Sequence, residues 1–238
     1  MKKILCVLCI LAVGATSFAT KLGLDFSLGT GYGFQNTKFE LLGEEVTYEQ
    51  MDWEAISIKV ATYDFFWLDD MLGLHAQLGF SPFVVNGGAL KLEGSEFELK
   101  GGQSGVPTEY RGIEFLVGPA FGIDLHEFIR FQMGLGFHFF RARSWKDFTY
   151  TEDVGSSTSM SISFSSYGIG LTPQLRFTPH KRLSFLVGCD LYFDFGGSTM
   201  EYFSYELAGK DMLWKLPDDI TGFFRFGMSP YIGVGINF

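Results

Sequence analysis

Residues 183–194 read LSFLVGCDLYFD, and their apolar side chains return at every second position. Leu183, Phe185 and Val187 fall on one side of this alternation, and Ser184 and Asp190 fall on the other. A period of two is that of a β-strand whose two faces meet different surroundings. The stretch therefore predicts a strand with one apolar and one polar face.

The same period recurs along the chain and predicts eight strands of about ten residues each. The strands are expected at 22–29, 55–61, 72–80, 113–121, 131–139, 167–177, 183–194 and 224–238. The connections between them alternate between short (64–71, 122–129, 178–182) and long (40–52, 81–110, 140–160, 195–222). An even strand count with this alternation is typical of a transmembrane β-barrel with short periplasmic turns and long outer loops. The predicted fold class is therefore all-β, an eight-stranded antiparallel up-and-down barrel.

Composition excludes several other classes of protein. The 238 residues are 17% aromatic and only 19% charged, which is too apolar for a disordered chain. A formal net charge of −9 argues against nucleic-acid binding, which requires a basic face. Three cysteines without paired CxxC motifs exclude a zinc domain and a disulfide scaffold.

The first nineteen residues have the pattern of a secretory signal peptide. Lys2 and Lys3 precede an apolar stretch over 4–15, and the segment ends in Ser17-Phe18-Ala19. That stretch is shorter than the roughly 20 residues that a membrane-spanning helix needs. We expect cleavage after Ala19, with residues 20–238 forming the barrel domain in the bacterial outer membrane.

The bulky apolar face is expected to point outward, toward lipid. Eight strands enclose an interior that side chains alone can fill, and the apolar set would overfill it. The opposite face is rich in glycine, which suits a crowded concave side. Its glycines include Gly134, Gly136, Gly168, Gly170, Gly233 and Gly235.

The chain ends with alternating apolar residues that run into a terminal phenylalanine. This end resembles the C-terminal strand signal of bacterial outer-membrane barrels, and the whole pattern resembles the small eight-stranded outer-membrane β-barrel proteins, the group that includes OmpX, OmpW and the membrane domain of OmpA. The resemblance implies that the barrel assembly machinery recognises this strand. The residues expected to carry the signal are Tyr231, Ile232, Val234, Ile236 and Phe238.

The inward face carries charges, which are costly in a narrow interior unless they are paired. We expect an ion-paired plug, in which Asp194 and Arg225 form one pair on adjacent strands. Arg130 and Arg176 lie near the short turns, so they are expected either to pair inside the barrel or, equally, to lie in water at the rim. A small ion path lined by the same charges is the competing interpretation. The predicted lumen charges are Asp25, Glu114, Asp190 and Asp194 against Lys59, Arg130, Arg176 and Arg225, with His75 and His138 beside them.

Three prolines and one irregularity disturb the strand pattern. Pro119, Pro173 and Pro230 fall inside predicted strands, where each removes a ladder hydrogen bond. Ser165-Ser166 breaks the alternation and is interpreted as a β-bulge. Residues 90–99 are expected to form a hairpin that continues the barrel above the membrane.

Aromatic side chains at the strand ends are expected to form interfacial girdles at the two membrane surfaces. The expected members are Trp53, Phe65, Phe66, Trp67, Phe128, Phe140 and Trp145.

No motif for catalysis, cofactor or metal binding stands out. His138 is expected near the outer rim, close in sequence to Ser144, but the two do not form a hydrolase motif. The sequence therefore predicts a non-enzymatic barrel without cofactor, metal or nucleic-acid partner. Its expected role is structural or interactive, with outer-membrane lipids as partners and an extracellular ligand or host partner at the loops.

Three other functions stay open. They are a narrow pore for ions or small solutes, a barrel that passes small apolar molecules sideways into the membrane, and a soluble secreted barrel. The charged interior counts against the second, and folding without detergent would identify the third.

Overall fold

The computed structural model describes residues 23–41, 44–92, 95–99, 109–144, 148–152, 156–207, 210–215 and 220–237. The expected signal peptide, its cleavage site and Trp145 lie outside these residues. Among the described residues, no helix is long and apolar enough to cross a membrane.

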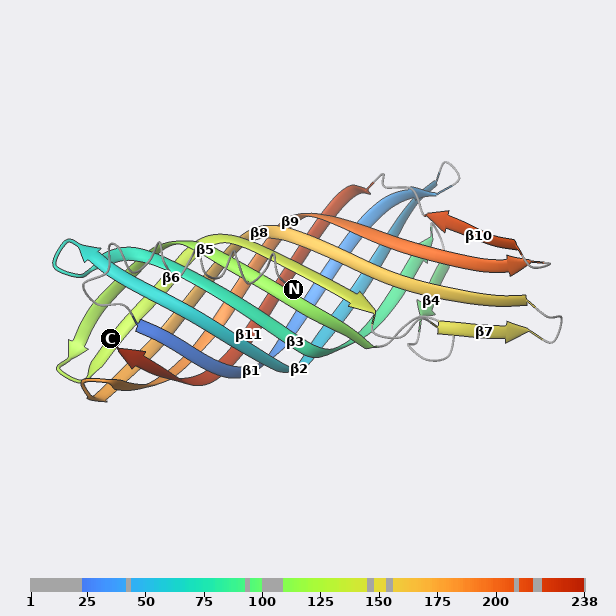
Figure 1. Cartoon of the computed structure of the whole chain (residues 1–238). Coiled ribbons are helices and arrows are strands. Elements are labelled where there is room, and N and C mark those ends of the chain that lie inside the picture. Colours follow the sequence, from blue (N-terminus) through green and yellow to red (C-terminus); the bar gives the residue numbers. More distant parts are fainter. Residues whose placement is uncertain are drawn as a thin grey trace.

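Eight antiparallel strands close into a barrel, which confirms the predicted fold class (Figure 1). Each strand pairs with the next along the chain, β9 pairs with both β8 and β11, and β11 pairs with β1. The eight strands are β1 (Gly23–Leu41), β2 (Glu44–Trp67), β3 (Leu72–Leu92), β5 (Glu109–His126), β6 (Ile129–Ser144), β8 (Ser156–His180), β9 (Leu183–Leu207) and β11 (Ile220–Asn237).

The strands run far beyond the lengths that the alternation predicts. They contain 16 to 25 residues, whereas crossing a bilayer takes roughly 9–11. The segments expected as long outer loops are therefore largely strand, which corrects that expectation. Three further short strands extend the same end: β4 (Ser95–Leu99), β7 (Phe148–Glu152) and β10 (Lys210–Lys215). β4 pairs with β3 from Gly88↔Leu99 to Leu92↔Ser95, so the predicted hairpin is present.

The two ends of the barrel differ. At one, which we call the turn end, strands are joined by tight turns at 68–71, 127–128 and 181–182, and the described chain begins and ends there. At the other, the hairpin end, β4, β7 and β10 continue past the barrel (Figure 1).

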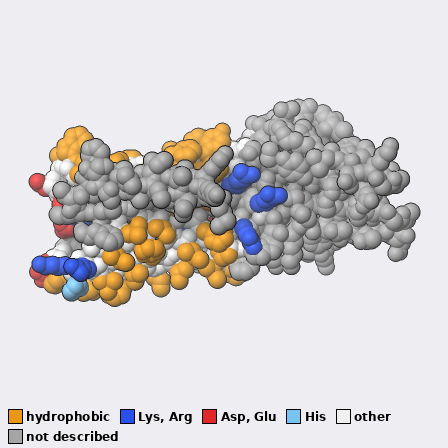
Figure 2. Space-filling view, in the orientation of Figure 1, with side chains coloured by type: hydrophobic (Ala, Val, Ile, Leu, Met, Phe, Trp, Pro, Cys, Tyr) orange, Lys and Arg blue, Asp and Glu red, His pale blue; other side chains and the backbone are white. Residues whose placement is uncertain are grey.

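The large apolar side chains point outward and form a belt around the barrel (Figure 2). Phe26, Leu28 and Ile232 are 41%, 58% and 68% exposed, whereas Asp25 and Lys59 on the other face are 3% and 1% exposed. A water-soluble barrel has the opposite polarity, with its apolar face around the interior. The orientation of the two faces follows the prediction.

The aromatic girdles are only partly as expected. Trp53, Phe66, Trp67 and Phe128 are exposed at the two edges of the belt. Phe140 is instead buried inside the barrel at 1% exposure. Alternate residues of a strand point inward, a property we call inward parity, and Phe140 shares it with His138.

The three prolines stay within their strands. Each pairs normally on one side, while on the other side the ladder is interrupted at the proline and resumes in the same register. The missing N–H of each proline therefore removes hydrogen bonds locally and leaves the register of the strand unchanged. The intact pairs are Pro119↔Leu74, Pro173↔Met133 and Pro230↔Cys189.

The expected bulge at Ser165-Ser166 is wrong. β8 pairs with β6 without interruption across both serines, and the nearby irregularity lies on β9, where Phe195 has no partner between Gly196↔Tyr167 and Asp194↔Gly168. Outward positions turn polar here because the strand leaves the apolar belt: Ser165 lies opposite Arg141. A change of surroundings, not an extra residue, breaks the alternation.

Close backbone contact between β5 and β6 requires glycine beside Pro119. A Cβ atom added to Gly136 would meet the carbonyl oxygen of Val117, and backbone cannot yield as a flexible side chain does. We expect Gly136→Ala to lower the free energy of unfolding by about 1–3 kcal/mol, measured by urea unfolding in detergent micelles.

Gly222→Ala is the matched control, because the nearest atom to its added Cβ would be Lys38 Cδ at 3.4 Å, an ordinary contact. Equal unfolding midpoints for the two variants would contradict this account of Gly136.

Candidate functional site

The interior of the barrel is filled by polar and charged side chains. Of the predicted lumen charges, the structure buries Asp25, Lys59, Glu114, Arg176, Asp190, Asp194 and Arg225. They lie in three clusters along the barrel, which we call turn-side, central and hairpin-side.

Lys59 is the centre of the central cluster. Its Nζ lies 2.5 Å from Asp190 Oδ2 and 3.0 Å from Glu114 Oε1, and it also donates to the hydroxyls of Tyr192 at 2.8 Å and Ser229 at 2.9 Å. Lys59 comes from β2, whereas these partners come from β5, β9 and β11. The ammonium group therefore connects strands on opposite sides of the barrel.

A second donor completes the central cluster. Gln77 Nε2 lies 2.7 Å from Asp190 Oδ2 and 3.4 Å from Glu114 Oε1, and the Tyr192 hydroxyl donates to the same Asp190 oxygen at 3.1 Å. Because buried carboxylates are stable only when hydrogen-bonded or paired, this set holds both acids in fixed positions.

The hairpin-side cluster surrounds Asp194. His138 Nδ1 lies 2.7 Å from Asp194 Oδ1, Ser166 donates to Oδ2 at 2.5 Å, and Arg225 Nη1 lies 3.5 Å from Oδ2. Asp194 and Arg225 occupy directly paired positions of β9 and β11. The Arg225 guanidinium carbon also lies 4.1 Å from the centre of the Phe140 ring, so the arginine is packed as well as paired.

Glu54 also belongs to this cluster, although the sequence pattern did not identify it. It is 4% exposed, accepts a hydrogen bond from Ser81 at 2.7 Å and lies 3.9 Å from Arg225 Nη2. The pairing of β2 with β3 is irregular on both sides of Ile56. This irregularity reverses which alternate residues point inward between Glu54 and the regular part of the strand. A strict two-residue period counted back from Lys59 therefore assigns Glu54 to the wrong face.

The turn-side cluster is built on Asp25 and Arg176. Arg176 Nη1 lies 2.9 and 3.1 Å from the two oxygens of Asp25, its Nε donates to Ser184, and its Nη2 donates to Asn237. Gln174 donates to Asp25 at 3.2 Å. Arg176 is 7% exposed, so of the two positions left open for it the structure supports the buried, paired one.

Arg130 lies at the rim, outside the filled interior, because it is the second residue of β6 and close to the turn. Its side chain is 19% exposed and pairs at 2.8 Å with Asp124, which is 71% exposed. Its guanidinium also donates to the backbone oxygen of Asp70 and lies over the ring of Phe65, which is therefore part of the barrel mouth.

The interior is not electrically balanced in the way the sequence predicted. With Arg130 at the rim and Glu54 inside, five buried acids face three buried bases among the described residues. The acids are Asp25, Glu54, Glu114, Asp190 and Asp194, and the bases are Lys59, Arg176 and Arg225.

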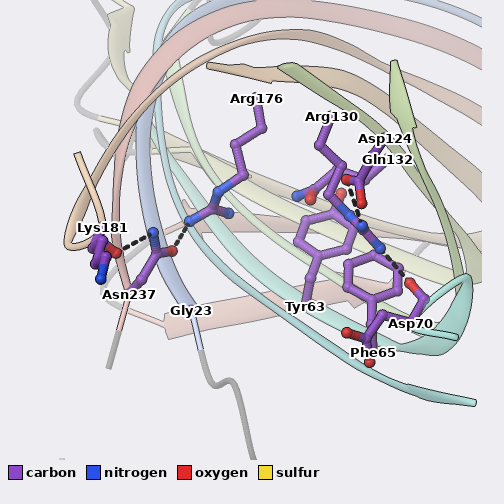
Figure 3. A pocket seen from close by; sticks show the side chains of 10 residues that line it. All are labelled: Gly23, Tyr63, Phe65, Asp70, Asp124, Arg130, Gln132, Arg176, Lys181 and Asn237. Carbon is purple, nitrogen blue, oxygen red and sulfur yellow. Dashed lines mark hydrogen bonds and ion pairs between the residues drawn. The ribbon is translucent and has the colours of Figure 1, made fainter. Parts of the chain in front are cut away.

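A pocket of about 410 Å³ opens at the turn end (Figure 3). Arg130 and Arg176, which are directly paired across β6 and β8, reach into it from the same part of the wall. The ring of Tyr63 lies between their guanidinium groups in Figure 3, and the ring of Phe65 lies beneath Arg130. The Tyr63 hydroxyl is bonded to Thr172 Oγ1 at 2.9 Å, so the pocket has a floor of side chains at this level.

His75 lies beside Tyr63, its directly paired residue on β3, and the sequence assigned it no role. It is 1% exposed, its ring centre lies 4.3 Å from that of Tyr63, and neither ring nitrogen has a hydrogen-bond partner among the described residues. No polar partner therefore fixes its orientation, which packing alone maintains.

His138, Asp194 and Ser166 are the residue types of a hydrolase triad but not its geometry. Ser166 donates to Asp194 rather than to His138, and all three side chains are fully buried. A nucleophile needs a base within reach and access to substrate. The expectation that His138 lies near the outer rim is wrong, because the barrel continues well beyond it. Among the described residues, no group of three His, Cys, Asp or Glu side chains could hold a metal ion.

The residues expected to form the assembly signal divide between the two faces. Ile232, Val234 and Ile236 point outward and are 68%, 41% and 40% exposed. Tyr231 points inward, is 6% exposed and donates to Gln174 at 2.9 Å, so its side chain is part of the lumen. Phe238 lies outside the described part of the chain.

Comparison with known proteins supports the fold. Neither a protein-family model nor a curated protein matches the chain. A major outer membrane protein of Thermus thermophilus has a similar structure, with a TM-score of 0.55, 14% identity, and coverage of 90% of this chain and 99% of that one. The outer membrane protein OprG of Pseudomonas aeruginosa gives a TM-score of 0.51 and 12% identity, covering 92% of this chain and 96% of that one. The predicted resemblance to small outer-membrane barrels is confirmed at the level of fold.

We expect Lys59→Met to destabilise the barrel by about 3–5 kcal/mol, because it leaves Asp190 and Glu114 buried without their shared cation. Urea unfolding in lipid bilayers, followed by tryptophan fluorescence, measures this loss. Lys181→Met is the control, since Lys181 is an exposed lysine at the turn end. An effect of Lys59→Met no larger than that of the control would show that Asp190 and Glu114 do not depend on Lys59 for their charge compensation.

Proposed function

We propose that the chain is an integral protein of the bacterial outer membrane whose barrel is closed to bulk flow and whose hairpin end interacts with the surroundings. The belt supports the membrane location, since soluble monomers rarely expose an apolar surface of this extent. A closed barrel also pairs each of its eight strands on both sides, as a lipid environment demands.

The closed lumen rests chiefly on one observation: Lys59 bonds to partners on three other strands across the middle of the barrel. An eight-strand interior is just wide enough for side chains to fill it. With the turn-side and hairpin-side clusters above and below, the interior acts as a stack of three ion-paired layers.

The hairpin end supplies surface for an interaction. Within the described residues, β4, β7 and β10 each pair with one strand only, β3, β8 and β9 respectively. A strand with a free edge can accept an extended segment of another protein by strand addition. This end would face the outside of the cell, because outer-membrane barrels keep their short turns on the periplasmic side.

A narrow cation path is the second candidate function. The described residues include five buried acids but only three buried bases. This surplus of acids favours a cation path, because a negatively charged interior attracts cations. The two proposals differ in whether the wild-type barrel conducts.

Planar bilayer recordings separate the two. We expect the wild-type protein to give no discrete openings, because side chains block all three levels. A variant with Lys59→Ala, Arg176→Ala and Arg225→Ala removes one large cation from each level and should produce discrete, cation-selective openings. The control, Lys181→Ala with Arg182→Ala, changes exposed residues at the turn end and should stay silent.

Heat-dependent mobility in gel electrophoresis checks that each variant is folded. Steady openings of the wild-type protein, with a size that changes on replacing Lys59, would contradict the closed barrel and favour the cation path.

A further inference from the structure

Three arginines gather on the outer face of the barrel, at the edge of the belt nearest the hairpin end. Arg111 of β5 is paired directly with Arg143 of β6, and Arg141 is paired with Ile113. All three arginines are exposed. We call them the arginine patch. Figure 2 shows basic side chains at this edge of the belt, where β6 ends in Figure 1.

The patch concentrates like charge. Residues directly opposite on antiparallel strands have Cβ atoms roughly 4.5–5.5 Å apart, and like charges in that position destabilise a sheet. Arg141, two residues from Arg143 on the same face, adds a third positive charge, and its partner on β8 is the neutral Ser165. In a protein with a formal net charge of −9, this local concentration makes the outer face positive here, and a positive surface attracts anions.

The height of the patch identifies the class of anion. Ile113 and Phe137, both 51% exposed, lie on the same outer face, two residues from Arg111 and four residues from Arg141 toward the turn end. If the belt spans the hydrocarbon, the arginines lie at the level of the lipid headgroups. Phosphate groups are found at this level, and the guanidinium fork binds phosphate with two parallel hydrogen bonds. Basic clusters directly beside a membrane span attract anionic headgroups.

We propose that Arg111, Arg141 and Arg143 bind the phosphate groups of a lipid in the leaflet at the hairpin end. The proposal rests on the proposed membrane location and adds a ligand to the outer surface of the barrel. It gives the protein a fixed lipid neighbour on the β5–β6 side, next to the hairpins. No part of the filled lumen is involved.

The test uses protein purified in a nonionic detergent from the membranes of an expressing bacterium. Native mass spectrometry measures its affinity for diphosphoryl lipid A and for the dephosphorylated form of the same lipid. At roughly 1 kcal/mol for each basic residue, the variant Arg111→Gln, Arg141→Gln, Arg143→Gln should bind diphosphoryl lipid A about a hundredfold more weakly than the wild type. The control, Lys181→Gln with Arg182→Gln, removes exposed positive charge at the opposite end and should bind like the wild type.

Three results would overturn the proposal: equal affinity of the patch variant and the wild type, equal affinity for the two lipids, or displacement of the lipid by inorganic phosphate at equimolar concentration. The last would indicate a site for a soluble anion. Insertion of each protein into phosphatidylcholine vesicles is measured in parallel. A wild-type protein that does not insert would overturn the membrane location together with the lipid site, whereas insertion without phosphate-dependent binding overturns the lipid site alone.

Discussion

A lysine buried in the middle of a closed eight-stranded barrel must find anionic partners there, because its side chain is only 1% exposed. Lys59 meets this requirement with Asp190 and Glu114, and with the hydroxyls of Tyr192 and Ser229. Its partners come from strands far apart in the sequence, so the bonds form only when the barrel has closed in one register. Since removing one partner of a buried ion pair costs far more than the pair contributes, the cluster specifies the register more than it adds stability.

The apolar outer face of the barrel follows from the charged interior. With the charges inside, the alternating pattern places the large apolar side chains outside, and a slip of one residue would exchange the two faces of a strand. Where strands leave the belt, outward positions become polar, as at Arg141 and Ser165. In the proposed membrane location, the end of the alternation marks the level of the membrane surface, and the arginine patch lies at that level.

Parity was enough to predict the strands, their two faces and the lumen position of residues such as Asp25 and Lys59. It was not enough to predict height along the barrel. Arg130 has an inward parity but lies at the rim. Phe140 shows the reverse: its aromatic type suggested a girdle, whereas its inward parity correctly places it inside, against Arg225. Glu54 escaped detection because an irregularity in β2 shifts the parity between it and Lys59.

Apart from the hairpin at 90–99, the strand extensions beyond the belt were also missed. Their pairing is set by neighbouring strands across the sheet, and beyond the apolar belt the outward positions are polar, so the alternation that reveals a strand is lost. Sequence periodicity thus reports the surroundings of a strand and not its full length. For the same reason Ser165-Ser166 resembled a bulge although β8 continues regularly through it.

The central claim is that Lys59 is held between two carboxylates inside a membrane-embedded barrel. Solid-state NMR on the protein in lipid bilayers tests it directly, through dipolar couplings between a labelled Lys59 Nζ and the side-chain carboxyl carbons. The account predicts couplings to both Asp190 and Glu114, consistent with N–O distances of 2.5 and 3.0 Å. A mobile Lys59 that exchanges with water and couples to neither carboxyl group would contradict it.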